Sequence, residues 1–420
     1  MPNLNDIKWP AADFSSVPYA VFGDQHVFDL EMERVFRGPV WCYVALEAEI
    51  ANPGDYKSVF VGDRSVVVNR AMDGTLHAFE NRCAHRGSTV VRHLNGNAKD
   101  HTCIYHHWSY DHRGNLIGVP FQRGIDGKGG MPESFDKADH GLRVLKLDTY
   151  RGVIFASFAD DIETLHDFLG QPMRDFLDRL FVKKVEILGY ARQRMPSNWK
   201  AYWENLTDPY HAGLLHQFQT TFGLFRQTQE GGTIMDDLKR HQIQYAIYDS
   251  DDDEKAEAEY AGTGVYDSTY KLQDPSIVGF RDEEGRGEAI YMMCVFPSIL
   301  FQRLSNTLAT RTIRPHSPEE FDLYWTYFGY ADDDDELREM RIRQVNLIGP
   351  GGLISMEDGE SGVQVQRAIG RVRDEYSTIQ MGGIGDVYDQ QHMVTEMPVR
   401  GFWRNYCKLM GMGPEAQAAE

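Results

Sequence analysis

The sequence is short of cysteine and of long apolar runs, and each shortage excludes a class of protein. Its five cysteines among 420 residues are too few and too scattered for the disulfide framework of a secreted domain. No run approaches the roughly 18 apolar residues that a membrane-spanning helix needs. Met1 to Pro10 has no apolar core of a signal peptide. We therefore expect an intracellular protein of the cytoplasm.

Basic residues are also scarce. Lysine and arginine number 43 against 63 acidic residues, which gives a formal net charge of −20. Nucleic-acid binding requires positive surface that displaces counterions from phosphates, and anionic membranes recruit basic clusters, so we expect neither partner. An apolar fraction of 42% is enough for a sizeable core. The length favours two or three domains.

Secondary-structure signals divide the chain into residues 1–40, 41–159 and 160–420. An amphipathic helix is expected to start near Asp24, and short β-rich runs follow from Tyr56. Turns are expected at Asp73-Gly74, Asn95-Gly96-Asn97 and Arg113-Gly114-Asn115. After residue 160 helices alternate with strands, a helix is expected to start at Asp332–Asp335, and the acidic run Asp251–Glu254 is expected to be a solvated loop.

Six of the fifteen histidines lie between Asn81 and Arg123, and two of them join two cysteines in a regular spacing. Cys83, His85, Cys103 and His106 form the pattern C-x-H-x17-C-x2-H, which gives each of two loops one thiol and one imidazole. Such a set suits tetrahedral zinc, or a two-iron cluster held by cysteines on one iron and histidines on the other. The alternation of Cys and His within each loop favours the cluster.

A second group of potential ligands follows about a hundred residues later. His211 and His216 would lie about 140° apart on a regular helix. Pro209 and Gly213 make the segment irregular, so that the two imidazoles can converge. Either a metal site or a core position for these histidines is compatible with the spacing alone.

The first pattern resembles the Rieske [2Fe–2S] site, with Cys83, His85, Cys103 and His106 as ligands. The stretch from Glu204 to His216 resembles the mononuclear iron signature of ring-hydroxylating oxygenase large subunits. This resemblance implies Fe(II) held by His211, His216 and a downstream carboxylate, which matches Asp358, with Glu357 beside it as the alternative. A solvated acidic pair at a helix end is the other interpretation of those two residues.

The resemblance also implies the fold and the electron path. We expect an α+β protein in which 41–159 is an all-β Rieske domain, 160–420 is a helix-grip catalytic domain with an antiparallel sheet, and 1–40 is a helical segment packing on the catalytic domain. Asp208 would bridge His211 to a Rieske histidine of the neighbouring subunit, with Asn205 near the iron and Tyr210 beside the ligand. A trimer is implied, with a small β subunit as α3β3, together with an NAD(P)H-dependent reductase or a ferredoxin.

Longer stretches, among them Phe79-Glu-Asn-Arg-Cys83 and Thr395-Glu-Met-Pro-Val-Arg400, resemble the terephthalate, salicylate and anthranilate oxygenases. That group binds aromatic carboxylates, and a buried arginine suits a carboxylate best. Arg311 and Arg400 are the candidates, pairing with internal acids being the alternative for both. Leu206 and Ile354 are further candidates for the substrate pocket.

The predicted protein is therefore a terminal oxygenase subunit that hydroxylates an aromatic carboxylate with O2, as a cis-dihydroxylating dioxygenase. A monooxygenase of the salicylate hydroxylase type, a non-catalytic electron-transfer protein and a zinc-stabilised binding protein are the alternatives. The window 81–123 holds six basic residues and two acids, a local charge of +4. We expect this basic patch to steer an acidic electron donor to the cluster.

Overall fold

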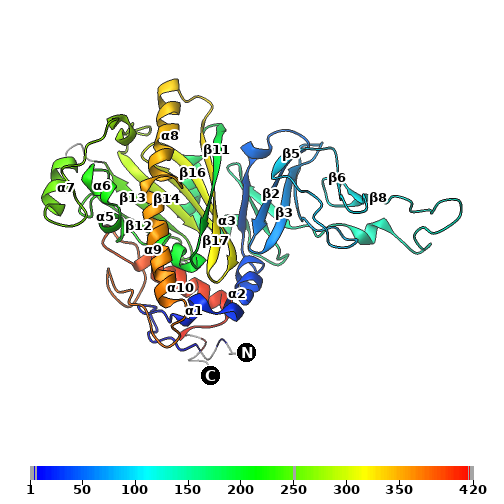
Figure 1. Ribbon diagram of the computed structural model, residues 1–420, viewed down its shortest axis with the longest axis horizontal. Coiled ribbons are helices and arrows are strands. Elements are labelled where there is room, and N and C mark those ends of the chain that lie inside the picture. The colour runs from blue at the N-terminus through cyan, green and yellow to red at the C-terminus, as the bar shows by residue number, and fades with distance from the viewer. Residues whose placement is uncertain (1–3, 5–6, 249–251, 415, 417–420) are drawn as a thin grey trace. The chain divides into compact units, whose positions relative to one another are not determined.

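The computed structural model describes residues 4, 7–248, 252–414 and 416, and its contacts divide the chain into two compact units (Figure 1). One unit is Phe36–Phe168, and the other combines Met1–Val35 with Leu169–Glu420. Along the sequence, the first unit is therefore an insertion in the second.

The Phe36–Phe168 unit consists mainly of short antiparallel strands. They are β1 (Cys42–Leu46), β2 (Asp55–Val61), β3 (Arg64–Arg70), β4 (Leu76–Glu80), β5 (Asn95–Asn97), β6 (His101–Thr102), β7 (Ser109–Tyr110), β8 (Leu116–Gly118), β9 (Lys146–Tyr150) and β10 (Val153–Ser157), with 3₁₀ turns at Glu47–Ile50 and Lys137–His140. Their sheets have the orders β4-β3-β2-β5, β1-β10-β9 and β6-β7-β8. The expected turns at Asp73-Gly74 and Arg113-Gly114-Asn115 are confirmed, since they join β3 to β4 and β7 to β8.

The expected turn at Asn95-Gly96-Asn97 is wrong. These residues form β5, which pairs with β2 in the register Asp55 to Asn97. The ring of Tyr56 lies against Gly96, where a Cβ atom would be only 2.6 Å from the tyrosine hydroxyl oxygen. Glycine here permits a close approach of side chain to backbone instead of a reversal of the chain.

The larger unit is built on one antiparallel sheet with the order β11-β17-β16-β15-β14-β13-β12. Its strands are β11 (Val185–Met195), β12 (Gly231–Met235), β13 (Gln242–Ile247), β14 (Glu288–Val295), β15 (Ile299–Leu304), β16 (Thr307–Ser317) and β17 (Glu320–Tyr330). The strands are rich in aromatic and β-branched residues, which favour a pleated and buried surface. The predicted α+β class with an antiparallel catalytic sheet is confirmed.

Helices complete this unit and position the site. They are α1 (Ala20–Gly23), α2 (Gln25–Glu31), α4 (Trp199–Thr207), α5 (Ala212–Leu215), α6 (Gln217–Thr221), α7 (Asp252–Tyr260), α8 (Asp335–Ile348), α9 (Leu353–Ile369) and α10 (Met397–Met410), while α3 (Leu165–Leu180) begins in the smaller unit; 3₁₀ turns lie at Pro275–Val278. Helix α4 packs against both α9 and α10, and α8 packs on β16. None of the described helices combines the length and apolarity needed to cross a membrane.

Two acidic runs have different outcomes. The run at Asp332–Asp335 does start a helix, because the Asp334 carboxylate caps α8 by accepting a bond from the Leu337 amide (2.8 Å). The expectation of a loop at Asp251–Glu254 is wrong from Asp252 onwards, where α7 begins, and Asp251 lies outside the described residues.

The N-terminal segment is tied into the larger unit by one buried carboxylate. Asp24 caps α2, which continues as a turn of π-helix over Met32–Phe36. At the end of α2, Glu31 accepts hydrogen bonds from Trp199 Nε1 (2.7 Å), Lys200 Nζ (2.6 Å) and the Tyr406 hydroxyl (2.5 Å). Residues from α2, α4 and α10 therefore share one ion-pair network.

Candidate functional site

The two cysteine–histidine segments form loops with the same backbone hydrogen bonding. The Cys83 amide donates to the Ser88 carbonyl and the Gly87 amide donates to the Cys83 carbonyl, both at 2.9 Å. The loop at Cys103 repeats both bonds at the same offsets, also at 2.9 Å. The fourth residue after each cysteine has a positive φ, 73° at Gly87 and 55° at His107. Each loop therefore turns back on itself and presents its ligand candidates at one end.

The thiols of these loops lie inside the protein and the imidazoles lie nearer its surface. Cys83 and Cys103 are buried in the core of the smaller unit, whereas His85 and His106 are half-buried. The two imidazole rings lie 4.5 Å apart, and the His85 ring stacks on Trp108. This arrangement suits a cluster whose cysteine side is shielded and whose histidine side is accessible.

The residues present fit a Rieske cluster. The two matched loops place both thiols in one buried cluster and both imidazoles next to each other. Nδ1 of His85 is buried without a hydrogen-bond partner among the described residues, as a nitrogen reserved for a metal would be. Tyr110 adds a hydroxyl 3.2 Å from the Cys83 sulfur. A hydrogen bond to a cluster sulfur is one of the means by which a protein sets the reduction potential.

The second site begins at the end of α4. Asn198 caps this helix at its start, and the helix ends at Thr207 because Asp208 precedes Pro209 and takes an extended conformation. The short helix α5 then separates His211 from His216, which lie at its two ends. The irregular backbone lets the two imidazoles converge, with ring centroids 5.3 Å apart.

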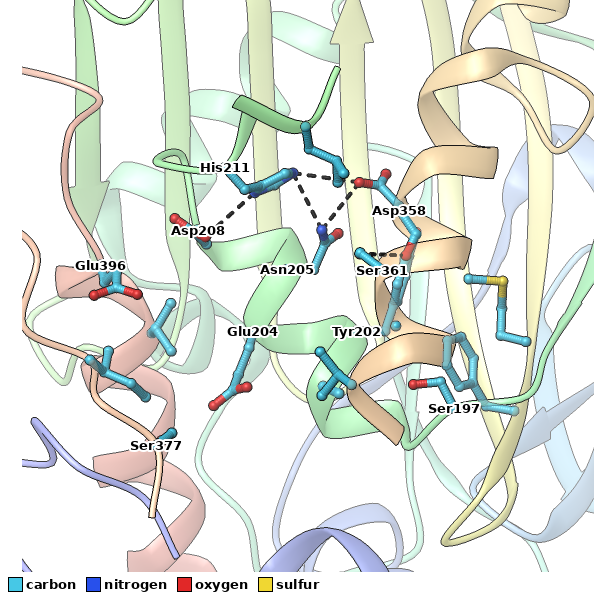
Figure 2. A pocket seen from close by; sticks show the side chains of 18 of the residues that line it. Ser197, Tyr202, Glu204, Asn205, Asp208, His211, Asp358, Ser361, Ser377 and Glu396 are labelled. Carbon is cyan, nitrogen blue, oxygen red and sulfur yellow. Dashed lines mark hydrogen bonds and ion pairs between the residues drawn. The ribbon is translucent and has the colours of Figure 1, made fainter. Parts of the chain in front are cut away.

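Helix α9 supplies the third ligand candidate from far along the chain. One oxygen of Asp358, Oδ1, lies 3.5 Å from Nε2 of His211 and 3.3 Å from Nε2 of His216 (Figure 2 shows Asp358 facing His211). Ligand atoms of the three side chains all lie within 4.8 Å of one another. Two imidazoles and one carboxylate are the donor set of non-haem Fe(II) oxygenases, so these residues fit a mononuclear iron.

Carboxylates also lie at the outer nitrogen of each histidine. Asp208 Oδ2 lies 3.5 Å from Nδ1 of His211, and Glu357 Oε2 lies 2.8 Å from Nδ1 of His216. Burial opposes the imidazolium of His211, but Asp208 and Asp358 outweigh it and raise its pKa to about 10. Both inner nitrogens therefore face Asp358, and both outer nitrogens are oriented by an acid.

Asn205 lies inside this group, and Tyr210 lies at its edge. The Asn205 amide nitrogen is 3.1 Å from Asp358 Oδ1 and 3.3 Å from Nε2 of His211 (Figure 2). The backbone amide of Tyr210 donates to Asp208 Oδ1 (2.7 Å) and so holds the carboxylate in place. The roles of both residues toward the iron stay predictions.

A pocket beside the ligand candidates contains three of the four predicted substrate residues. Leu206, Arg311 and Ile354 line it together with His211, His216 and Asp358. Arg311 is 3% exposed, donates from Nε to Gln302 Oε1 (2.6 Å) and lies over the ring of Trp325 at 4.3 Å. Its Nη1 donates to the Tyr202 hydroxyl (3.4 Å), and none of the ion pairs among the described residues involves Arg311.

Arg400, the fourth predicted substrate residue, lies elsewhere. Its guanidinium donates to the carbonyls of Asp13 (3.0 Å), Gly383 (2.6 Å) and Gly385. It is fully buried and does not line the pocket that contains Arg311. Its guanidinium also lies 3.5 Å from Asp13 Oδ2, so the structure shows the pairing with an internal acid that is the alternative for Arg400, and its role toward a substrate stays a prediction.

Two residues at the site were missed by sequence reasoning. The sequence suggests Glu357 only as the alternative iron ligand, whereas in the structure it contacts the outer nitrogen of His216. Gln219, on α6, lines the Arg311 pocket, and none of the residues that the structure describes makes a hydrogen bond to its buried Oε1. Neither has a sequence signal, because polar residues are common in such helices and only the fold directs these two inward.

Comparisons with known proteins agree with this geometry. Residues 40–133 match the family model of the Rieske [2Fe-2S] domain, and residues 182–412 match that of the ring hydroxylating alpha subunit (catalytic domain). The cofactors are accordingly a [2Fe–2S] cluster in the smaller unit and a mononuclear iron in the larger one.

Three curated relatives align over nearly the whole chain. The large subunit of anthranilate 1,2-dioxygenase from Burkholderia cepacia is 47% identical over 97% of this chain and 96% of its own length. The alpha 2 subunit of the terminal oxygenase component of terephthalate 1,2-dioxygenase from Comamonas sp is 41% identical, covering 98% and 99%. The large oxygenase component of salicylate 5-hydroxylase from Ralstonia sp is also 41% identical, covering 97% of both chains.

A solved structure supports the fold. Naphthalene 1,2-dioxygenase from Rhodococcus sp., bound to indole, superposes with a TM-score of 0.78 at 24% identity, over 95% of each chain. At this identity the likeness establishes the shared architecture of the two units' folds.

Proposed function

The chain belongs to the ring-hydroxylating oxygenase large subunits, and on that premise we propose that it hydroxylates an aromatic carboxylate, as a cis-dihydroxylating dioxygenase. It is an oxidoreductase of the Rieske dioxygenase class. The observation that carries the substrate proposal is Arg311, a buried cation without an acidic partner among the described residues, in the pocket that His211, His216 and Asp358 also line.

Each ligand candidate has a distinct role in the proposal. Cys83, His85, Cys103 and His106 hold the cluster, and His211, His216 and Asp358 hold the Fe(II), which supplies the site where O2 is reduced. Iron held by these three residues would lie beside the substrate pocket, because the same residues line it. Glu357 and Asp208 fix the ring orientations of the two histidines, and Asn205 donates to the inner oxygen of Asp358.

Asp208 is the proposed link to the electron source. Its carboxylate contacts the outer nitrogen of His211 and lines a cavity, so a second polar group can approach it from that side. We assign it the bridge to a Rieske histidine of a neighbouring subunit in a trimer, with a small β subunit completing α3β3. A cytoplasmic location, where NAD(P)H is available to the reductase, belongs to the same proposal.

The pocket suits a planar anion. The Arg311 guanidinium can donate two parallel bonds to a carboxylate, and Trp325 beneath it keeps the cation in place. Leu206 and Ile354 supply apolar surface for the ring. Among the described residues that line this pocket, Arg311 is the single lysine or arginine, so a second carboxylate on the ring would have no cation to meet.

Gln219 narrows the substrate class further. Its buried, unpartnered Oε1 can accept a hydrogen bond from a neutral ring substituent such as an amino or hydroxyl group. A buried polar group built to bond a substituent disfavours an analogue that lacks it. Aminobenzoates and hydroxybenzoates are therefore the proposed substrates, ahead of terephthalate.

The electron donor is proposed to dock at the basic patch of the smaller unit. Two of its arginines, Arg82 and Arg113, pair with Glu80 and Asp73, which lie just outside the 81–123 window. Including these acids reduces the local charge from +4 to +2. Arg86, which lies over the Tyr105 ring beside the cluster loop, remains the best placed cation to attract an acidic reductase or ferredoxin.

Substrate profiling with ¹⁸O2 tests the proposal. The purified protein, supplied with a compatible reductase, is expected to convert anthranilate or salicylate faster than terephthalate, and both labelled oxygens should enter the product. One labelled oxygen would identify the monooxygenase alternative. A Rieske spectrum with about three irons per chain excludes zinc. Hydroxylation that persists in His211→Ala, or no product from any aromatic acid, would overturn the proposal.

A further inference from the structure

A second cavity adjoins the iron-binding residues and differs in charge from the substrate pocket. It has a volume of about 370 Å³ and is lined by Asp208, His211 and Asp358, and also by Glu204, Glu396 and Ser197 (Figure 2). Four carboxyl groups and no lysine or arginine belong to its described lining. Such a lining disfavours an aromatic carboxylate, so the space that this cavity offers besides the approach to Asp208 proposed above is open to another role.

The cavity is suited to water. Ser197 lines the cavity, and its hydroxyl oxygen is buried with no hydrogen-bond partner in the described part of the chain. The volume is sufficient for several water molecules, and the surrounding carboxyl oxygens provide the partners that ordered water requires. A hydrogen-bonded water chain can therefore connect the carboxyl groups on its walls with His211 and Asp358.

Glu204 lines this cavity and, unlike Asp208 and Asp358, has no role in the proposed function so far. It lies on α4, and its Oε1 accepts a hydrogen bond from Trp403 Nε1 (2.6 Å). Burial raises the pKa of Glu204 to about 8, against the lowering effect of the Trp403 N–H, and the charges of Glu396 and Asp208 add to the rise. Lys200, one turn earlier, lowers it only weakly because its ammonium is paired with Glu31.

Glu396 faces the same cavity from the start of α10. Its Oε2 accepts a hydrogen bond from the Met381 amide (2.9 Å). Burial raises the pKa of Glu396, and Asp208 contributes to that rise. Glu204 and Glu396 thus lie within electrostatic range of each other and of Asp208, on walls that also reach the iron-binding residues.

The reaction requires protons as well as electrons. Conversion of an arene and O2 into a cis-diol consumes two electrons, which the reduced electron-transfer protein supplies, and two protons, which must come from solvent. Monooxygenation to a phenol and water consumes the same two electrons and two protons. We propose that Glu204 is the proton-relay residue of this oxygenase, passing protons through water in the second cavity to the iron site and regaining them by way of Glu396.

In each transfer the Glu204 O–H bond breaks as an O–H bond to cavity water forms, and the product takes up a proton at the other end of the water chain. The carboxylate that remains takes the next proton from the Glu396 side. The inference rests on the proposed function only for the direction of proton flow, since the titration of Glu204 can be measured in the resting protein.

The test combines kinetics with infrared spectroscopy. Glu204→Gln keeps an acceptor for Trp403, so it is expected to retain cluster and iron while kcat falls about 100-fold and KM changes little. The wild-type kcat should fall above pH 8, because the acid form is lost there, and this limb should disappear in the variant. Glu257→Gln, the same charge change at an exposed site on α7, is the control.

The infrared arm needs no turnover. The resting wild type should show a carboxylic-acid C=O band at pH 7 that is absent from Glu204→Gln and has a midpoint near the kinetic one. Glu396→Gln should fold even if the first variant does not, and should move both midpoints to lower pH by removing a negative charge. An unchanged kcat and pH profile in Glu204→Gln, or no C=O band at pH 7, overturns the relay. Absence of hydroxylation in the wild type instead overturns the proposed function.

Discussion

Glu357 Oε2 lies 2.8 Å from Nδ1 of His216, on the side of the ring that faces away from Asp358. Since this contact orients the ring for metal binding, Glu357→Ala is expected to weaken iron binding about 10- to 100-fold without affecting the cluster. Iron content after dialysis against a chelator, with the Rieske spectrum as internal reference, measures this. Glu360→Ala, an exposed residue of the same helix, is the control, and equal iron retention in both variants would contradict the role.

Arg311 is predicted to control affinity for the carboxylate. Arg311→Gln should raise KM for an aminobenzoate about 100-fold, because the substrate carboxylate would then be buried without a cation. The KM of Arg311→Lys should lie between those of the wild type and Arg311→Gln, since lysine keeps the charge but loses the planar guanidinium that binds a carboxylate with two bonds. A neutral ring such as aniline should be turned over equally by all three proteins. The control is Arg343→Gln on the surface of α8; a rise in KM for aniline as large as for the acid would point to general damage.

Tyr110 is predicted to raise the reduction potential of the cluster. Its hydroxyl lies 3.2 Å from the Cys83 sulfur, and such a bond stabilises the more negative, reduced state. If the bond favours that state by about 1.4 kcal/mol, Tyr110→Phe lowers the potential by roughly 60 mV. Redox titration followed by the visible spectrum measures the shift. Tyr105→Phe removes an exposed hydroxyl near the same loops, and a shift of equal size there would contradict the assignment.

Asp322 is predicted to stabilise the larger unit in a pH-dependent manner. Its buried carboxylate pairs with Arg192 and Arg194 (both 2.6 Å) and with His316 (2.7 Å). Burial opposes the charge, but these partners hold the pKa of Asp322 at about 2. A lowered pKa gives stability that is present above pH 4 and lost as the pH falls through 2.

Asp322→Asn should therefore cost about 2 kcal/mol in the free energy of unfolding at pH 7. The difference from wild type should narrow below pH 4. Urea unfolding at several pH values measures this difference in the free energy of unfolding. Asp332→Asn, the same substitution at an exposed position, is the control. A difference that stays constant down to pH 2 would show that packing, not charge, is responsible.

The local parts of both metal sites could be predicted from the sequence. Each Cys–His pair of the first site, Cys83 with His85 and Cys103 with His106, lies within a single loop. Pro209 indicates the irregular backbone that brings His211 and His216 together. Asp358 could be found only through a family resemblance, because nothing near it in the sequence indicates that α9 packs against α4. Sequence patterns therefore predict contacts between residues a few positions apart, but not contacts between distant segments.

The environments of Arg311 and Arg400 could not be predicted from the sequence. Arg311 lies between two threonines of a strand and Arg400 between Val399 and Gly401, with no acidic residue next to either, and both are buried. One faces a pocket without a carboxylate partner in the described chain, whereas the other donates to the carbonyls of Asp13, Gly383 and Gly385. Every residue has a backbone carbonyl, so the sequence does not show which carbonyls will accept hydrogen bonds from an arginine. The two environments therefore cannot be distinguished before the fold is known.

The network around Glu31 has a consequence for dividing the chain. An expression fragment that starts after residue 160 would contain Lys200, Trp199 and Tyr406 but not the carboxylate to which all three donate. An uncompensated buried ammonium costs about 3 to 5 kcal/mol, a large part of the stability of an average domain. The N-terminal segment that contains Glu31 is therefore needed for the stability of the larger unit. A fragment designed to fold alone should join this segment to the residues after 168 and omit the smaller unit, Phe36–Phe168.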